Sequence, residues 1–165
     1  MATHWAGGVI ILIAGPLQFV PCIRRHYPAV HRWTGRAYLA ACALTALPGL
    51  VYTCMFGTVG GLPMDVSFIG YGIVMLACAG ATGYHAIRRD IQSHREWATR
   101  LYAVGIGSAV YRLLIAPTII VFIPDAAFKV WLNVATWVFY IPNLAVAELF
   151  VRGYCVGCCR SADST

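Results

Sequence analysis

The stretch IRRHYPAVHRWTGRAY, residues 23–38, returns 64 positions later as IRRDIQSHREWATRLY, residues 87–102. A His-Arg pair occurs in both copies, with its place shifted by one residue. Six further positions are identical at the fixed offset: Ile23/Ile87, Arg24/Arg88, Arg25/Arg89, Trp33/Trp97, Arg36/Arg100 and Tyr38/Tyr102. This agreement indicates that the stretch is duplicated. The segments around the two copies indicate what role each copy has.

Long apolar segments surround both copies. Of the 165 residues, 60% are hydrophobic and 11% are charged, whereas soluble domains carry about 25% charged residues. A helix needs about 20 apolar residues to cross the ~30 Å hydrocarbon core of a bilayer. Five such segments are predicted, at residues 5–23, 33–56, 66–87, 98–123 and 129–152. The sequence therefore predicts one all-α transmembrane bundle over residues 1–152 and a short cytosolic tail at 153–165.

Two other fold classes fit the sequence poorly. A soluble helical domain requires polar faces at a period of 3.6 residues, and stretches such as GGVIILIAGPLQFV have none. Transmembrane β-strands alternate apolar and polar residues, and these segments do not alternate. A transmembrane helical bundle is the class that remains.

The position of each copy in the chain predicts the topology. Each copy joins one expected helix to the next, so helices 1–2 and 3–4 form a parallel internal repeat with a pseudo-twofold axis along the membrane normal. Ten of the 12 basic residues lie in these two turns, at the end of the last predicted segment or in the tail. The positive-inside rule then places the N-terminus outside and the C-terminus in the cytosol, in the plasma membrane or an endomembrane. Topology and attraction to anionic lipid account for the net charge of +6 without nucleic acid.

The arginines of the two turns predict an anion site. They lie around helix starts, where free backbone N–H groups and the helix dipole favour a phosphate or a carboxylate. If the repeat brings the turns together, they frame one site; the alternative is nonspecific contact with acidic lipid. The candidate ligand-binding residues are Arg32, Arg36, Arg95, Arg100, Arg112, His31 and His94.

Histidines near the same turns also suggest a haem b site. Bis-histidine ligation needs two imidazoles at one depth on facing helices. His85 lies about one turn inside the third predicted helix, and His31 or His94 is its candidate mate. The alternative is that these histidines cap helices and bond lipid phosphates.

Arg112 lies about 21 Å along the fourth predicted helix from Ala98, inside the hydrocarbon, where an arginine costs at least ~2.5 kcal/mol and needs partners. Glu148 lies too near the cytosolic end to reach it. Pro142 leaves the Val138 carbonyl without its helical donor, so this carbonyl and Tyr140 are the expected partners, with Asn143 nearby.

The seven cysteines do not predict a disulfide framework. Four lie in or beside apolar segments and pack as small hydrophobic residues. Cys155, Cys158 and Cys159 follow the last helix beside arginines, which is a setting for S-palmitoylation. A zinc site here would lack a nearby histidine.

The stretches GPLQF (15–19), HRWTGRAY (31–38) and HREWATRLY (94–102), followed by Arg112, resemble an uncharacterised family of predicted bacterial and fungal membrane proteins. Its pattern is a first-helix histidine, a Gly-Pro-Leu-Gln-Phe stretch, an HRxxGRxY turn and an HRxWMxR turn leading to a helical arginine. The resemblance covers about residues 4 to 115. Ala98 replaces the family's methionine, and members usually carry one more helix before the first histidine. The resemblance implies a membrane fold and no reaction, because the family is a domain of unknown function.

The sequence leaves three functions open. No metalloprotease, nucleophile-elbow or phosphate-loop motif is present. The leading interpretation is a noncatalytic binding or assembly component, in a homo-oligomer or with a membrane partner protein. The alternatives are a haem-b electron carrier and a membrane-embedded enzyme that acts on a lipid-like substrate through Arg112 and Glu148.

Overall fold

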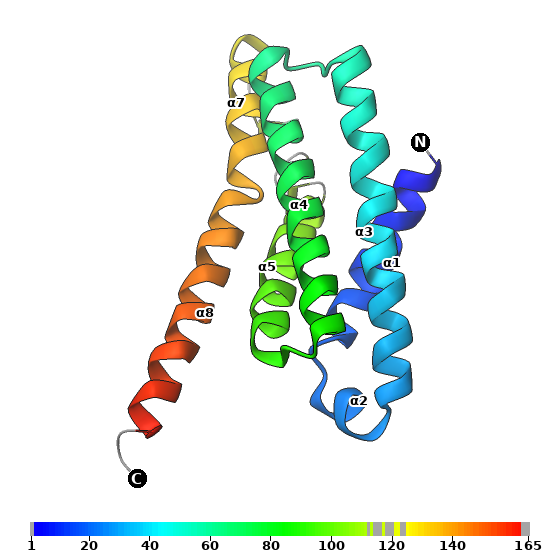
Figure 1. Cartoon of the computed structure of the whole chain (residues 1–165). Helices are drawn as coiled ribbons and strands as arrows, with labels where there is room; N and C mark the ends of the chain where they lie inside the picture. The colour runs from blue at the N-terminus through cyan, green and yellow to red at the C-terminus, as the bar shows by residue number, and fades with distance from the viewer. Residues whose placement is uncertain (1, 112, 114–116, 118–120, 123–124, 163–165) are drawn as a thin grey trace.

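The computed structural model describes the backbone of residues 2–111, 113, 117, 121–122 and 125–162, and side chains in this part except at 2–5, 125–126 and 154–162. The regular elements of this part are all helical, which confirms the predicted all-α class (Figure 1). They are α1 (Ala2–Leu17), α2 (Pro21–His26), α3 (Pro28–Phe56), α4 (Leu62–Arg88), α5 (Ile91–Val110), α7 (Asp125–Val138) and α8 (Ile141–Ala162).

Three helices of the described part are long and apolar enough to cross a membrane: Pro28–Phe56, Leu62–Arg88 and Ala127–Gly153. The last of these runs through α7 and α8, and a shorter apolar helix covers Ala6–Leu17. The predicted fourth segment, 98–123, continues past α5 into residues outside the description. The number of five crossings therefore stays a prediction.

The first predicted segment, residues 5–23, is wrong in its length. The helix ends at Leu17, and a new short helix begins at Pro21. Between them, Val20 is extended, with φ −70° and ψ 114°. Proline disfavours the helical conformation in the residue before it, here Val20, but it fits the first position of a helix. Pro21 therefore separates α1 from α2 and is the first residue of α2.

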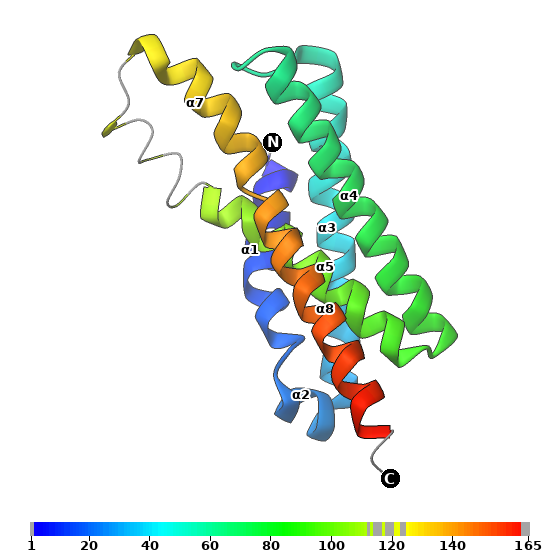
Figure 2. The same cartoon turned by 90° about the vertical axis from the view of Figure 1, so that its left-hand side faces the viewer.

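Two helical hairpins form the bundle. Helix α1 packs along α3, α4 packs along α5, and α3 contacts α4 to join the pairs. The α3–α4 loop and the start of α7 lie at one end (Figures 1 and 2). Both α2 and the α4–α5 turn lie at the other end, which is called the basic end below because it carries both copies of the duplicated stretch. The repeat axis itself remains a prediction.

A glycine in α1 leaves room for the rings of both duplicated tyrosines, of which Tyr38 is buried and Tyr102 is half-buried. A Cβ atom at Gly15 of α1 would lie 3.0 Å from the Tyr102 ring of α5 and 3.3 Å from the Tyr38 ring of α3. Leu101 and Val104, which belong to the same buried cluster as Tyr38, have no exposed surface. The absence of a side chain at Gly15 thus lets three helices pack around two large rings.

The GPLQF stretch contacts the part of the first duplicated copy that lies in the first turns of α3. Gln18 follows α1, and its Nε2 donates a hydrogen bond to Thr34 Oγ1 at 2.8 Å. A Cβ atom at Gly35 would lie 3.1 Å from Gln18 Oε1. These contacts fasten the end of α1 to the first turns of α3 and so position the histidine at the start of α3.

The last predicted segment, 129–152, is divided at Phe139 and Tyr140, between α7 and α8. Pro142 lies at the second position of α8, where its missing N–H costs no helical hydrogen bond. The side chain of Asn143 donates from Nδ2 to the Phe139 carbonyl oxygen at 3.0 Å. Helix α8 then continues to Ala162, so the predicted tail prolongs the last helix for most of its length.

Candidate functional site

The duplicated tryptophans and arginines make the same contact in both copies. The Arg36 guanidinium carbon lies 5.1 Å from the centre of the Trp33 ring. The corresponding distance from Arg100 to Trp97 is 4.9 Å. Residues three apart face each other on a helix, so the Trp-x-x-Arg spacing itself produces this cation–π geometry. Part of the duplication therefore has a local structural role.

His31 and His94, one from each turn, lie within electrostatic range of each other. His31 belongs to the first turn of α3, and its Nδ1 is buried without a hydrogen-bond partner among the described residues. The His94 Nδ1–H donates to the Thr82 carbonyl oxygen of α4 at 3.0 Å. Arg24 and Arg32 also act electrostatically on His31. A charge on His94 therefore acts on His31 across the two turns.

His85 takes part in a different contact. Its Nδ1–H donates to Asp90 Oδ2 at 3.2 Å, and Asp90 Oδ1 accepts from the Ser93 amide at 3.1 Å. Hydrogen bonds from the Ser93 hydroxyl and amide, and then from His85, hold the pKa of the Asp90 carboxyl below its usual range. Asp90 is the N-cap of α5. The structure pairs His85 with Asp90 and not with His31 or His94.

The predicted arginines fall into two groups. Arg32, Arg36 and Arg95 are exposed at the basic end and form no ion pair among the described residues. Arg100 lies deeper, with 16% of its side chain exposed, and its Nε–H donates to Glu148 Oε2 of α8 at 2.8 Å. The first group is free to contact an external anion, whereas Arg100 is already bound within the fold.

The ion pairs of Glu148 are the contacts that the sequence analysis did not predict. Its Oε1 accepts from Arg152 Nε at 3.1 Å, while Oε2 accepts from Arg100. The Glu148/Arg152 spacing of four residues was a visible signal for the first pair. The pair with Arg100 joins positions 48 residues apart, and no sequence pattern links them.

Several predicted residues lie outside what the structure describes. They include Arg112 and the side chains of Cys155, Cys158 and Cys159. Of Arg112's expected partners, Tyr140 has its hydroxyl 3.4 Å from where a Cβ atom at Gly70 of α4 would lie. Among described residues, no group of three or more His, Cys, Asp or Glu side chains could hold a metal ion.

A family model described as "Predicted membrane protein (DUF2306)" matches residues 1–151. No curated protein and no solved structure matches the chain significantly. The match covers both hairpins, both duplicated turns and Glu148.

Proposed function

The chain belongs to the DUF2306 family of predicted membrane proteins, and on this premise we propose that it is a noncatalytic protein that recognises an anionic headgroup. The ligand is the phosphate group of an acidic lipid, bound at the basic end. The observations that support the proposal are the electrostatic interaction between His31 and His94 and the exposed arginines beside them, which form no ion pair within the part of the chain that the structure describes.

Charge supports this ligand class. Arginines left without a carboxylate at a membrane surface attract acidic lipid, at about 1 kcal/mol for each residue. A planar guanidinium offers several N–H donors that match a phosphate in geometry as well as in charge. Arg32 and Arg95 follow the two histidines directly in the chain, so one headgroup could contact both turns.

His31 and His94 support a specific hydrogen-bonded contact with the lipid phosphate, in addition to attraction between charges. A buried polar atom without a partner costs about 1–3 kcal/mol. The His31 Nδ1 is such an atom, and a phosphate oxygen is an acceptor that would satisfy its protonated form. His94 is already oriented by Thr82, which leaves its Nε2 for a second contact. On this proposal, the basic end lies on the cytosolic side, where acidic lipids are enriched.

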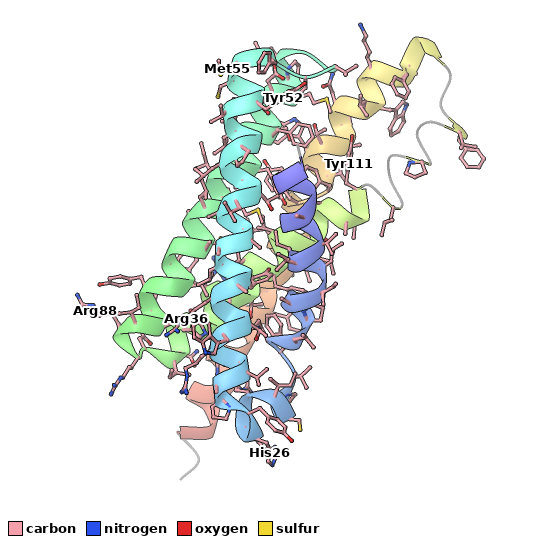
Figure 3. The ribbon with its side chains drawn as sticks, turned by 90° about the vertical axis from the view of Figure 1, so that its right-hand side faces the viewer. His26, Arg36, Tyr52, Met55, Arg88 and Tyr111 are labelled. Atoms are coloured by element: carbon pink, nitrogen blue, oxygen red, sulfur yellow. The ribbon has the colours of Figure 1, made fainter. Side chains whose placement is uncertain are left out.

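We expect Arg95→Gln to weaken retention of phosphatidylglycerol by the purified protein about fivefold, the equivalent of ~1 kcal/mol. Native mass spectrometry of lipid titrated into detergent-solubilised protein measures this loss, and phosphatidylcholine retention should not change. Arg88→Gln is the matched control, because Arg88 lies over the Tyr84 ring and points away from the bundle at the same end (Figure 3). Equal losses from the two variants would contradict a directed site.

Haem b is a second candidate ligand, supported by the same pair of histidines. Metal-bound histidines usually donate their other ring N–H to a backbone carbonyl or a carboxylate, as His94 donates to Thr82. His31 and His94 would be the two axial ligands, rather than either one with His85. On this alternative, haem added to the purified protein gives a Soret band that His31→Ala and His94→Ala each abolish. Wild-type protein with no such band would exclude it.

A further inference from the structure

Three buried oxygen atoms lie around the loop between α3 and α4, at the end of the bundle opposite the basic end (Figures 1 and 2). They are Thr58 Oγ1, Asp65 Oδ1 and Asn133 Oδ1, and none of them has a hydrogen-bond partner within the part of the chain that the structure describes. Buried polar atoms in native proteins almost always have a partner, and a bound ion is one of the groups that can supply it. Three such oxygens around one loop therefore indicate a shared ligand.

Both Asp65 and Asn133 contact this loop. Asp65 is in the first turn of α4, and its Oδ2 lies 3.5 Å from where a Cβ atom at Gly57 would lie. Asn133 comes from α7, and its Nδ2 donates to the Gly60 carbonyl oxygen at 3.2 Å. This hydrogen bond uses the nitrogen of the amide and leaves its oxygen as an acceptor.

The loop itself is a tight turn. Gly57 and Gly61 have φ values of 68° and 73°, which side-chain-bearing residues rarely adopt. The Gly61 N–H donates to the Thr58 carbonyl oxygen at 3.1 Å. Along this turn, Thr58 lies one residue from the contact with Asp65 and two residues from the contact with Asn133. The turn thus places a carboxyl group, a hydroxyl group and an amide oxygen around itself.

The end of α3 favours a cation at this place. The last carbonyl groups of a helix have no helical donor and carry the negative end of the helix dipole. Helix α3 ends at Phe56, and the carboxyl group of Asp65 faces Gly57, the next residue. Asp65 forms no ion pair among the described residues. A cation here would offset both the carboxylate and the carbonyl dipoles.

The donor set selects a hard cation. Carboxylate, amide and carbonyl oxygens are ligands of Ca²⁺, which takes about six to eight oxygens in a flexible arrangement. Metals that prefer thiolate or imidazole would find neither among these three side chains. Because the charge of the ligands tunes affinity, one carboxylate predicts a weak site, with a Kd of about 10⁻⁴–10⁻³ M as in extracellular modules. The predicted topology places this end outside the cytosol.

We propose that the α3–α4 loop and α7 together bind one Ca²⁺ ion through Asp65, Asn133 and Thr58, with water completing the coordination. The ion joins the α3–α4 hairpin to α7, two parts of the chain that are far apart in sequence. It is a binding site for a cation at one end of the bundle, separate from the anion site proposed at the basic end.

Calcium titration into the detergent-solubilised full chain, washed with EDTA, tests the site. Calorimetry should show saturable binding with a Kd of about 10⁻⁴–10⁻³ M, and saturating Ca²⁺ should raise the midpoint of thermal unfolding. Asp65→Asn removes the carboxylate and should weaken binding at least about tenfold. Asp90→Asn is the matched control, because it removes the same charge at the basic end and asparagine can still cap α5.

Asn133→Asp tests the same site in the opposite direction, whether or not Asp65→Asn folds. A second carboxylate should tighten Ca²⁺ binding about tenfold. The proposal would be overturned by an absence of saturable binding up to about 10 mM Ca²⁺, tenfold above the weak end of the expected range. Equal affinities of Asp65→Asn and Asp90→Asn, or equal stabilisation by Na⁺ at the same ionic strength, would also overturn it.

Discussion

Replacing Gly107 by alanine should destabilise the bundle by on the order of 3 kcal/mol, the cost of overpacking at a rigid contact. A Cβ atom at this position of α5 would overlap the Phe139 carbonyl oxygen and lie 3.1 Å from Asn143 Nδ2. The obstacle is backbone and cannot rotate away. The hydrogen bond from Asn143 to Phe139 joins α8 to the end of α7, so relief of the overlap also disturbs this junction.

Thermal unfolding of the detergent-solubilised protein measures the loss as a lower midpoint. Gly80→Ala is the matched control, because a Cβ atom there meets no heavy atom within 4 Å. Alanine is favoured over glycine in a helix by up to ~1 kcal/mol, so the control should be neutral or more stable. Equal midpoints for the two variants would mean that α5 does not pack closely against the α7–α8 junction.

Removing the Glu148 carboxylate should be the second large change. Glu148→Ala leaves Arg100, with 16% of its side chain exposed, without its hydrogen-bonded carboxylate between α5 and α8. A charge that loses its partner away from water is strongly destabilising. The midpoint of thermal unfolding should fall by several degrees, and the exchange Arg100→Glu with Glu148→Arg should recover part of the loss.

Arg152→Ala provides the control for this pair. It removes the other ion pair of the same carboxylate, but 76% of the Arg152 side chain is exposed, and exposed pairs contribute little. If Arg152→Ala destabilises the protein as much as Glu148→Ala, the contact between α5 and α8 depends on surface charge. In that case Arg100 would not hold the two helices together.

Composition and local chemistry predicted the helical membrane class, because apolar runs and one-sided arginines follow from the bilayer itself. The helix breaks were also readable in principle. Pro21 and Pro142 stand next to both interruptions, yet the predicted segments ran across them. An apolar run predicts one continuous helix, whereas proline disfavours a helical conformation in the residue before it. Apolar composition predicts that a segment lies in the membrane. It does not show where the helix within that segment is interrupted.

The candidate site was less predictable, because its contacts join distant parts of the chain. His85 was paired with His31 or His94 by depth alone. The structure pairs His85 with Asp90, a local cap, and leaves His31 and His94 within electrostatic range of each other. Arg100 was grouped with the anion-binding arginines by sequence spacing, and its partner Glu148 comes from α8. The spacing of residues along one helix does not show which side chain of another helix will form an ion pair with them.

The central claim is that the two turns form one anion site, and a double-mutant cycle tests it most directly. Arg32→Gln and Arg95→Gln each remove one charge beside a histidine of the pair, and retention of phosphatidylglycerol is measured for both variants and their combination. The account predicts losses that differ from additivity by about 0.5 kcal/mol or more, since both groups contact one ligand. Additive losses that disappear at high salt would contradict it and leave two independent lipid-facing patches.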